Sequence, residues 1–212
     1  MNIHSLEWDG QLLGFFDLPR HILPEIRSSS EIYGRLSSGS LQGVPISGCL
    51  GDQQAALVGQ QCFRPGQTKA TYGTGCFILT NVGTRPVESQ HGLLATVGYK
   101  VGDRPPVYAL EGSIASAGSA LDWLSSVIGT TDVEIGRRRE MREEGETGDD
   151  DTGDVYFVTA FGGLLAPHWR PDARGTIVGI TQFTRREHLV RACMESICYQ
   201  VNISRSRKCP IL

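Results

Sequence analysis

The run of strand-like segments between residues 68 and 110 constrains the fold of this chain more than any other feature. Four mainly apolar segments, separated by turn residues, make up this run: Thr68–Tyr72, Cys76–Thr80, Gly92–Tyr99 and Val107–Leu110. Their short spacing predicts an antiparallel meander, in which each strand pairs with the next one along the chain. Residues 114–128 then carry apolar side chains at helical spacing, and Gly129 ends the pattern. Strands followed by a helix indicate an α/β fold rather than an all-β sandwich.

Further elements are expected before and after this run. They are a short apolar strand in Val44–Leu50, a helix in Gln53–Gln60, strands in Val155–Val158 and Thr176–Ile180, and a helix in His188–Val201. Asp52 is the expected N-cap of the first helix, because an aspartate side chain can accept hydrogen bonds from first-turn N–H groups. The methionine and tryptophan side chains are expected in the core.

One segment, residues 131–154, differs in composition from the rest of the chain. The basic run Arg137-Arg138-Arg139 is followed by Glu143-Glu144-Gly145-Glu146 and Asp149-Asp150-Asp151. Blocks of like charge with few apolar residues predict a solvated, disordered loop. Calcium binding is the weaker alternative, because the three adjacent aspartates lack the alternating spacing of an EF-hand loop.

Composition argues against several classes of protein. The 212 residues carry a formal net charge of −3, which gives no electrostatic reason to expect nucleic acid or an anionic membrane as a partner. No apolar run approaches the roughly 20 residues of a membrane span, and no signal peptide is visible. The six cysteines include no C-x-x-C pair, which argues against a zinc site or a disulfide framework. A reduced, cytoplasmic protein is expected, with mitochondrial association left open.

The most informative segment for chemistry is residues 47–56, with the sequence SGCLGDQQAA. Asp52 stands at the end of the expected apolar strand and directly before a helix, a place where α/β proteins bind ligands. A carboxylate there can act as a general base and accept the proton of an attacking hydroxyl, an effect worth about 10²–10⁴ in rate. The alternative is that Asp52 only caps the helix, and the spacing alone favours this simpler interpretation.

A second candidate is the Gly-Thr-Gly turn of residues 73–75, between two expected strands. The backbone N–H groups and the hydroxyl of such a tight hairpin can face a phosphate. The turn matches neither a P-loop nor a complete G-x-G-x-x-G motif, so by itself it is more typical of an ordinary hairpin. His168, on an expected loop, is likewise more typical of a structural histidine than of a proton shuttle.

Taken together, these segments resemble the FGGY family of carbohydrate kinases. The resemblance is carried by GDQQAALVGQ at residues 51–60, YGTGCF at 72–77, YALEGS at 108–113 and APHWRPDARG at 166–175. It extends from the start of the chain to about Gln200 and includes the family's C-terminal signature region at residues 175–195. It is strongest for the members that phosphorylate glycerol.

The resemblance implies a truncated actin-like (RNase H-like) α/β kinase fold, whose two domains surround a cleft. It also implies phosphoryl transfer from ATP, with Mg²⁺, to glycerol, which gives sn-glycerol 3-phosphate. Asp52 falls on the position of the catalytic base, where it also contacts substrate, and Gln53 and Phe77 fall on further substrate-contacting positions. The positions that the resemblance assigns to the nucleotide are Thr74, Gly75 and Gly118. No metal-ligating residue is assigned.

The resemblance also implies a division of the chain, which matches the middle of the family's sequence. Residues 1–60 correspond to the end of the first domain, residues 61–201 to a truncated second domain, and residues 202–212 to a divergent tail. Asp122 stands where members acting on glycerol often carry a nucleotide-contacting glutamine. Three alternatives stay open: an inactive fragment or pseudo-enzyme, a module that binds a kinase partner, and a kinase of another sugar. A homo-oligomer also stays open.

Overall fold

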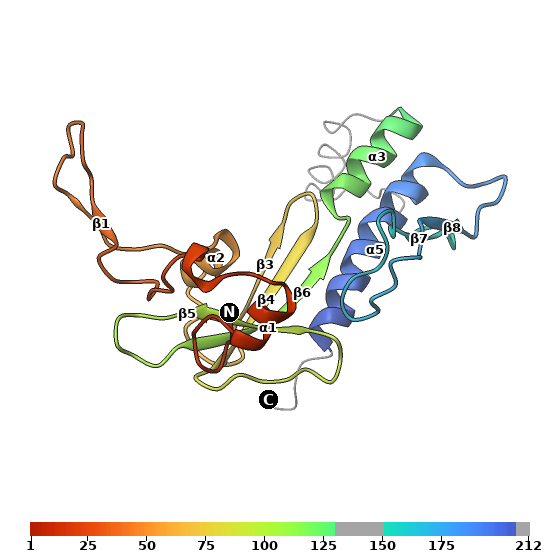
Figure 1. The fold of residues 1–212 in the computed structure, drawn as a ribbon. Coiled ribbons are helices and arrows are strands. Elements are labelled where there is room, and N and C mark those ends of the chain that lie inside the picture. Colours follow the sequence, from red (N-terminus) through yellow and green to blue (C-terminus); the bar gives the residue numbers. More distant parts are fainter. Residues whose placement is uncertain (130–150, 207–212) are drawn as a thin grey trace.

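The computed structural model describes residues 1–129 and 151–206 (Figure 1). Residues 130–150, which include most of the predicted acidic loop of residues 131–154, and residues 207–212 of the predicted tail lie outside the described residues. No helix in the described part of the chain combines the length and the apolar composition that crossing a membrane requires.

A four-stranded antiparallel sheet forms the centre of the fold. Its strands are β3 (Thr68–Tyr72), β4 (Cys76–Gly83), β5 (Leu94–Tyr99) and β6 (Val107–Ile114). Their spatial order is β3-β4-β6-β5, so the predicted meander is right for β3–β4 and β5–β6 but wrong for β4–β5, since β6 lies between these two strands. Burial explains this order: most residues of β6 are buried, as a central strand requires, whereas β5 has one buried residue and suits an edge.

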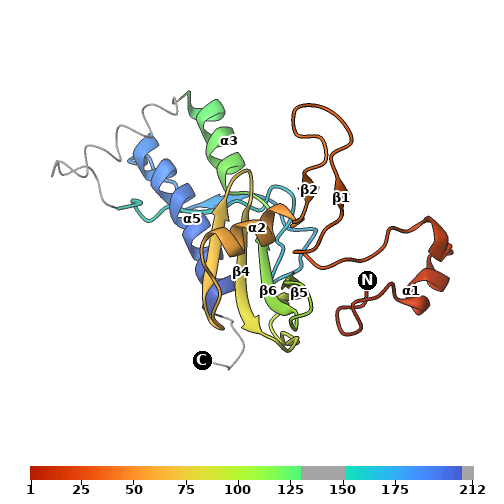
Figure 2. The same ribbon diagram turned by 90° about the vertical axis from the view of Figure 1, so that its left-hand side faces the viewer.

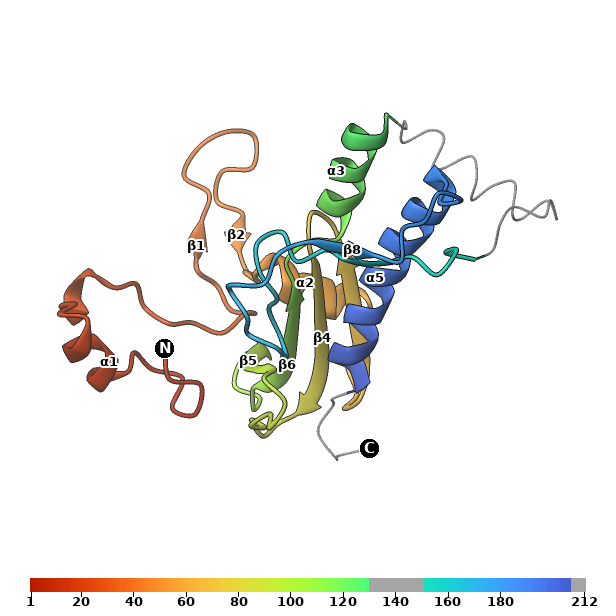
Figure 3. The same cartoon turned by 90° about the vertical axis from the view of Figure 1, so that its right-hand side faces the viewer.

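The two faces of the sheet are covered by helices from distant parts of the chain. Helix α2 (Asp52–Gly59) lies on one face, where its Leu57 belongs to a cluster with Leu79 and Ala109 (Figure 2). Helix α5 (Arg186–Ser206) lies on the other face, where Ile197 joins Ile78 (Figure 3). Because successive side chains of a strand point to opposite faces, the odd-numbered residues of β3, β4 and β6 face α2.

A second group of elements packs together with α5. It consists of helix α3 (Gly118–Ile128) and the paired strands β7 (Tyr156–Val158) and β8 (Thr176–Val178), with Leu124, Phe157 and Cys193 in one buried cluster. The helix predicted for residues 114–128 begins only at Gly118, because residues up to Ile114 continue β6 and pair with β4. It ends where predicted, at Gly129, which has the left-handed conformation (φ 66°) that often terminates helices.

The first fifty residues contribute little to the core. They form the short helices α1 (Gly10–Phe15) and η1 (Arg20–Ile22) and the paired strands β1 (Gly34–Arg35) and β2 (Pro45–Ile46). The apolar strand predicted for residues 44–50 is therefore reduced to two exposed residues. Figures 2 and 3 show α1 and the β1–β2 hairpin standing away from the central sheet. Among the described residues, the first buried apolar side chain along the chain is that of Leu57.

Candidate active site

Polar side chains gather on the sheet face that lies under α2. Lys69 and Thr71 of β3 and Glu111 and Ser113 of β6 all lie on this face, and Phe77 of β4 is in register between Thr71 and Ser113. The Ser113 hydroxyl donates to the Glu111 carboxylate at 3.4 Å. We call these five residues the sheet patch. Strands β3 and β4 lead from it directly into the hairpin of residues 73–75.

Asp52 lies at the start of α2 and is exposed. Its predicted role as the N-cap is wrong, because Gly51 occupies that position with extended backbone angles and its carbonyl accepts the first helical hydrogen bond, from Ala55. The Asp52 carboxylate instead accepts a bond from the backbone N–H of Gln53 at 2.8 Å. Its place in the first helical turn suits a negative charge, because the helix dipole is positive there.

Gln53 connects Asp52 to the sheet patch. Its side-chain nitrogen Nε2 lies 3.5 Å from Oδ2 of Asp52, and its oxygen Oε1 accepts a hydrogen bond from Nζ of Lys69. Lys69 also donates to the Thr71 hydroxyl at 2.9 Å. The helix start and the sheet are therefore joined by a continuous polar chain from the exposed carboxylate to a buried ammonium.

Lys69 was not predicted as a functional residue, although only 3% of it is exposed. Burial lowers the pKa of its ammonium, and the negative charges of Glu111 and Asp52 act in the opposite direction. The sequence gives little reason to single out Lys69, because β3 is an edge strand and lysine is common on edge strands. Only the register with β4 and β6 shows that this lysine faces inward.

The Gly-Thr-Gly turn forms the predicted hairpin and packs against the start of α3. The carbonyl oxygen of Gly73 accepts from the Gly118 N–H at 2.9 Å, and that of Thr74 accepts from Ala117 and Ser119 at 2.9 and 3.2 Å. First-turn N–H groups of α3 are thus satisfied by the hairpin rather than by a capping side chain. The exposed Thr74 is left at the tip of the turn.

The structure brings the six predicted site residues into two adjoining groups. Asp52 and Gln53 lie at the start of α2, over the same face on which Phe77 packs against the Leu57 cluster. Thr74, Gly75 and Gly118 form the junction between hairpin and helix. The two groups adjoin because Phe77 lies two residues after Gly75 on β4.

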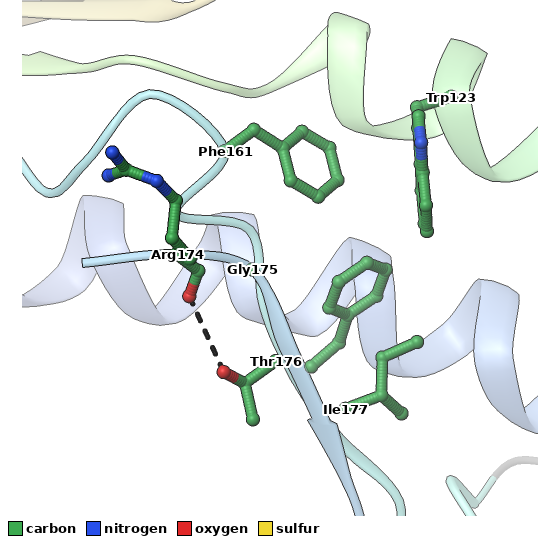
Figure 4. A pocket seen from close by; sticks show the side chains of 7 residues that line it. Trp123, Phe161, Arg174, Gly175, Thr176 and Ile177 are labelled. Carbon is green, nitrogen blue, oxygen red and sulfur yellow. Dashed lines mark hydrogen bonds between the residues drawn. The ribbon is translucent and has the colours of Figure 1, made fainter. Parts of the chain in front are cut away.

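An apolar pocket of about 620 Å³ lies between α3 and β8 and was not predicted (Figure 4). It is lined by Trp123, Phe157, Phe161, Arg174, Gly175, Thr176 and Ile177. The ring of Trp123 lies 4.9 Å from that of Phe161, and 42% of Trp123 is exposed, so the expectation of a core tryptophan is wrong here. Among the described residues, no three His, Cys, Asp or Glu side chains lie close enough together to hold a metal ion.

Comparison with protein families identifies this arrangement. The model of the C-terminal domain of the FGGY family of carbohydrate kinases matches residues 68–204, and that of the N-terminal domain matches residues 1–59. The chain belongs to the FGGY family of carbohydrate kinases. The resemblance drawn from the sequence, and the FGGY kinase fold expected from it, are confirmed.

Glycerol kinases are among the FGGY kinases that this chain is similar to. It is 50% identical over 205 residues to the glycerol kinase of Brucella anthropi and 53% identical over 204 residues to glycerol kinase 1 of Streptomyces coelicolor. These alignments cover 95% and 94% of this chain but 39% of each relative. The chain therefore spans about two fifths of the length of these relatives.

Solved structures of FGGY kinases agree with this relationship. The crystal structure of Plasmodium falciparum glycerol kinase with ADP matches with a TM-score of 0.82 and 41% identity, over 95% of this chain and 40% of that one. A xylulose kinase from Lactobacillus acidophilus matches with a TM-score of 0.77 over 97% of this chain and 41% of that one. Since its identity is 20%, this second match concerns the fold alone.

Proposed function

We propose that this chain carries the catalytic base and part of the nucleotide site of an ATP-dependent glycerol kinase. The observation that carries the proposal is the position of Asp52, an exposed carboxylate at the start of α2 that Gln53 links to the sheet patch. The identity of about 50% to glycerol kinases supports glycerol as the acceptor. We assign residues 1–60 to the end of the first kinase domain and residues 61–201 to the second.

In the proposed reaction, Asp52 accepts the proton of a glycerol hydroxyl while the hydroxyl oxygen attacks the γ-phosphorus of ATP. The bond between the γ-phosphorus and the bridging oxygen breaks, and its electron pair leaves with ADP. Gln53 hydrogen-bonds the substrate, and the Phe77 ring packs against its carbon atoms. Phosphoryl transfer depends mainly on positioning and on neutralising charge, and these groups are this chain's contribution to positioning on the substrate side.

We assign the nucleotide phosphates to the hairpin of residues 73–75 and to Gly118. The turn lies so close to the end of β6 that a Cβ at Gly75 would be 2.5 Å from the carbonyl oxygen of Ile114. The glycine at this position leaves no side chain beside the exposed Thr74. Mg²⁺ in kinases is held by one or two carboxylates together with the nucleotide phosphates, and Glu111 of the sheet patch would be such a carboxylate. The ion would supply neutralisation of phosphate charge.

The test uses a graft in which this chain replaces the matching segment of Streptomyces coelicolor glycerol kinase 1, so that the parts of the relative outside the match are present. We call this protein the grafted kinase.

Asp52→Asn should reduce kcat for glycerol by about 10²–10⁴, the usual effect of losing a general base, and leave KM for ATP unchanged. Asp17→Asn is the matched control, because Asp17 is exposed with φ 50°, a conformation that asparagine tolerates. A loss of less than tenfold for Asp52→Asn would show that the base lies elsewhere.

A further inference from the structure

We propose that Lys69 fixes the orientation of the Gln53 side-chain amide, so that this amide presents its N–H donors, and not its oxygen, to the Asp52 side of the site. Lys69 is then a positioning residue that acts on substrate through Gln53. The inference rests on the proposed function only where it concerns substrate. The orientation of the amide is a property of the chain itself and can be measured without turnover.

The hydrogen-bonding capacities of the two side chains carry the argument. A glutamine amide has an acceptor end and a donor end, whereas an ammonium can only donate. Nζ of Lys69 lies against Oε1 of Gln53, and Nε2 of Gln53 then points toward Oδ2 of Asp52 at 3.5 Å. Reversing the amide would put N–H groups against the ammonium and the amide oxygen against the carboxylate. Both contacts would be repulsive, so one orientation is selected.

Burial makes this selection strong. A buried ammonium without acceptors is costly, and the acceptors that hydrogen-bond Nζ of Lys69 are Gln53 and the Thr71 hydroxyl. The charged groups that act on this ammonium include Glu111 from β6 and Asp52 from α2. Glu111 is also engaged by the Ser113 hydroxyl. Lys69 therefore cannot release Gln53 without losing one of its two hydrogen bonds.

The consequence for substrate is a matched pair of contacts at one hydroxyl. Asp52 offers an acceptor to the hydroxyl proton, and the Gln53 Nε2 offers a donor to a lone pair of the hydroxyl oxygen. A hydroxyl satisfies both contacts because it is donor and acceptor at once. If the Gln53 amide were reversed, Asp52 and Gln53 would both present acceptors, and the hydroxyl could satisfy only one of them.

The first experiment measures the amide orientation in the 212-residue chain by nuclear magnetic resonance. The side-chain N–H pair of Gln53 is assigned by its disappearance in Gln53→Glu. In Lys69→Met, which keeps an unbranched apolar side chain one atom shorter but removes the ammonium, this pair should shift toward the positions of a free glutamine. In Lys69→Arg, which keeps the donors, the pair should stay close to its original position. An unchanged pair in Lys69→Met overturns the proposal.

The second experiment measures kinetics in the grafted kinase. Lys69→Met should raise KM for glycerol by about three- to tenfold, the effect of one hydrogen bond, and Lys69→Arg should restore most of it. Gln53→Glu keeps an acceptor for Lys69 but removes the donors, so it should raise KM at least as much at unchanged thermal stability. An unchanged KM in Gln53→Glu overturns the proposal even if Lys69→Met does not fold. If Asp52→Asn leaves activity intact while the amide resonances respond to Lys69, the proposed function fails and the orientation of Gln53 stands.

Discussion

The backbone N–H of Gly118 donates to the carbonyl oxygen of Gly73 at 2.9 Å, and a Cβ on residue 118 would lie only 2.6 Å from that oxygen. The start of α3 and the hairpin are therefore in direct backbone contact. Glycine at 118 is required by this close approach and not by its backbone angles, since its φ lies outside the left-handed region. The relation between hairpin and helix, on which the proposed nucleotide site depends, rests on this contact.

Gly118→Ala should displace the hairpin from α3. Because backbone on both sides resists the added methyl group, we expect a loss of about 1–3 kcal/mol in the free energy of unfolding of the chain. In the grafted kinase the same change should raise KM for ATP more than KM for glycerol. Gly73→Ala is the matched control, since a Cβ there meets no atom within 4 Å, and it should change stability by less than about 0.5 kcal/mol. Equal effects of the two substitutions would contradict the importance of this contact.

Cysteine reactivity should follow burial. Burial raises the pKa of Cys76 to about 11 and that of Cys193 to about 12, so both thiols stay protonated at pH 8. Cys49 and Cys198 are exposed. We expect iodoacetamide to label Cys49 and Cys198 in the folded chain, and Cys76 and Cys193 only after unfolding in urea, as read by mass spectrometry of peptides. Rapid labelling of Cys193 without urea would show that the cluster around it opens readily.

The same two thiols should weaken the fold at alkaline pH. Their folded pKa values are above the ordinary value of 9.0, so the folded chain holds these protons more tightly than the unfolded chain does. The contribution of the two thiols to the free energy of unfolding is therefore complete below about pH 9. It is lost as pH rises toward 11 to 12, at about 1.4 kcal/mol per pH unit for each thiol. Urea unfolding at several pH values measures the slope, and Cys193→Ala should make it shallower. A slope that Cys193→Ala leaves unchanged would assign the loss to other groups.

Lys69 should act on stability in the opposite direction. Its folded pKa is lowered below the ordinary 10.5, so the folded chain gives up this proton more easily, and stability relative to Lys69→Met should increase as pH rises toward 10.5. At pH 7 the variant loses two hydrogen bonds but avoids burying a charge, so its free energy of unfolding should stay within about 1 kcal/mol of the original. Urea unfolding at pH 7 and pH 10 checks both statements. A large loss at pH 7 would mean that Lys69 mainly holds the fold.

The two aromatic residues Phe157 and Trp123 should differ in their contribution to stability. Phe157 is 5% exposed and belongs to the cluster with Leu124 and Cys193, so Phe157→Ala should cost about 3–5 kcal/mol. Trp123 lines the pocket of Figure 4 with 42% of its surface exposed, so Trp123→Ala should cost less than half as much. Chemical denaturation of both variants measures the difference. Similar losses would show that the pocket is part of the core.

Much of the local structure could be predicted from the sequence. The four strands, the Gly-Thr-Gly hairpin and the helix end at Gly129 depend on side-chain alternation and on glycine, whose effects act within a few residues. The family motifs are also contiguous, so Asp52, Gln53, Thr74, Gly75 and Phe77 were found as candidates. The contacts of these residues were not predicted. Asp52, for example, was expected to cap the helix, a role that Gly51 takes.

The sequence by itself determined most of the strands and helices and the family, because each depends on residues that are neighbours in the chain. Only the tertiary structure decided that β6 enters the sheet between β4 and β5, that Lys69 faces inward onto Gln53, and that Trp123 lines a pocket. These relations join residues far apart in the chain, and each depends on which surfaces are buried together. Burial of a strand on two faces, or of an ammonium beside its acceptors, is a property of the packed molecule, and no local pattern specifies it.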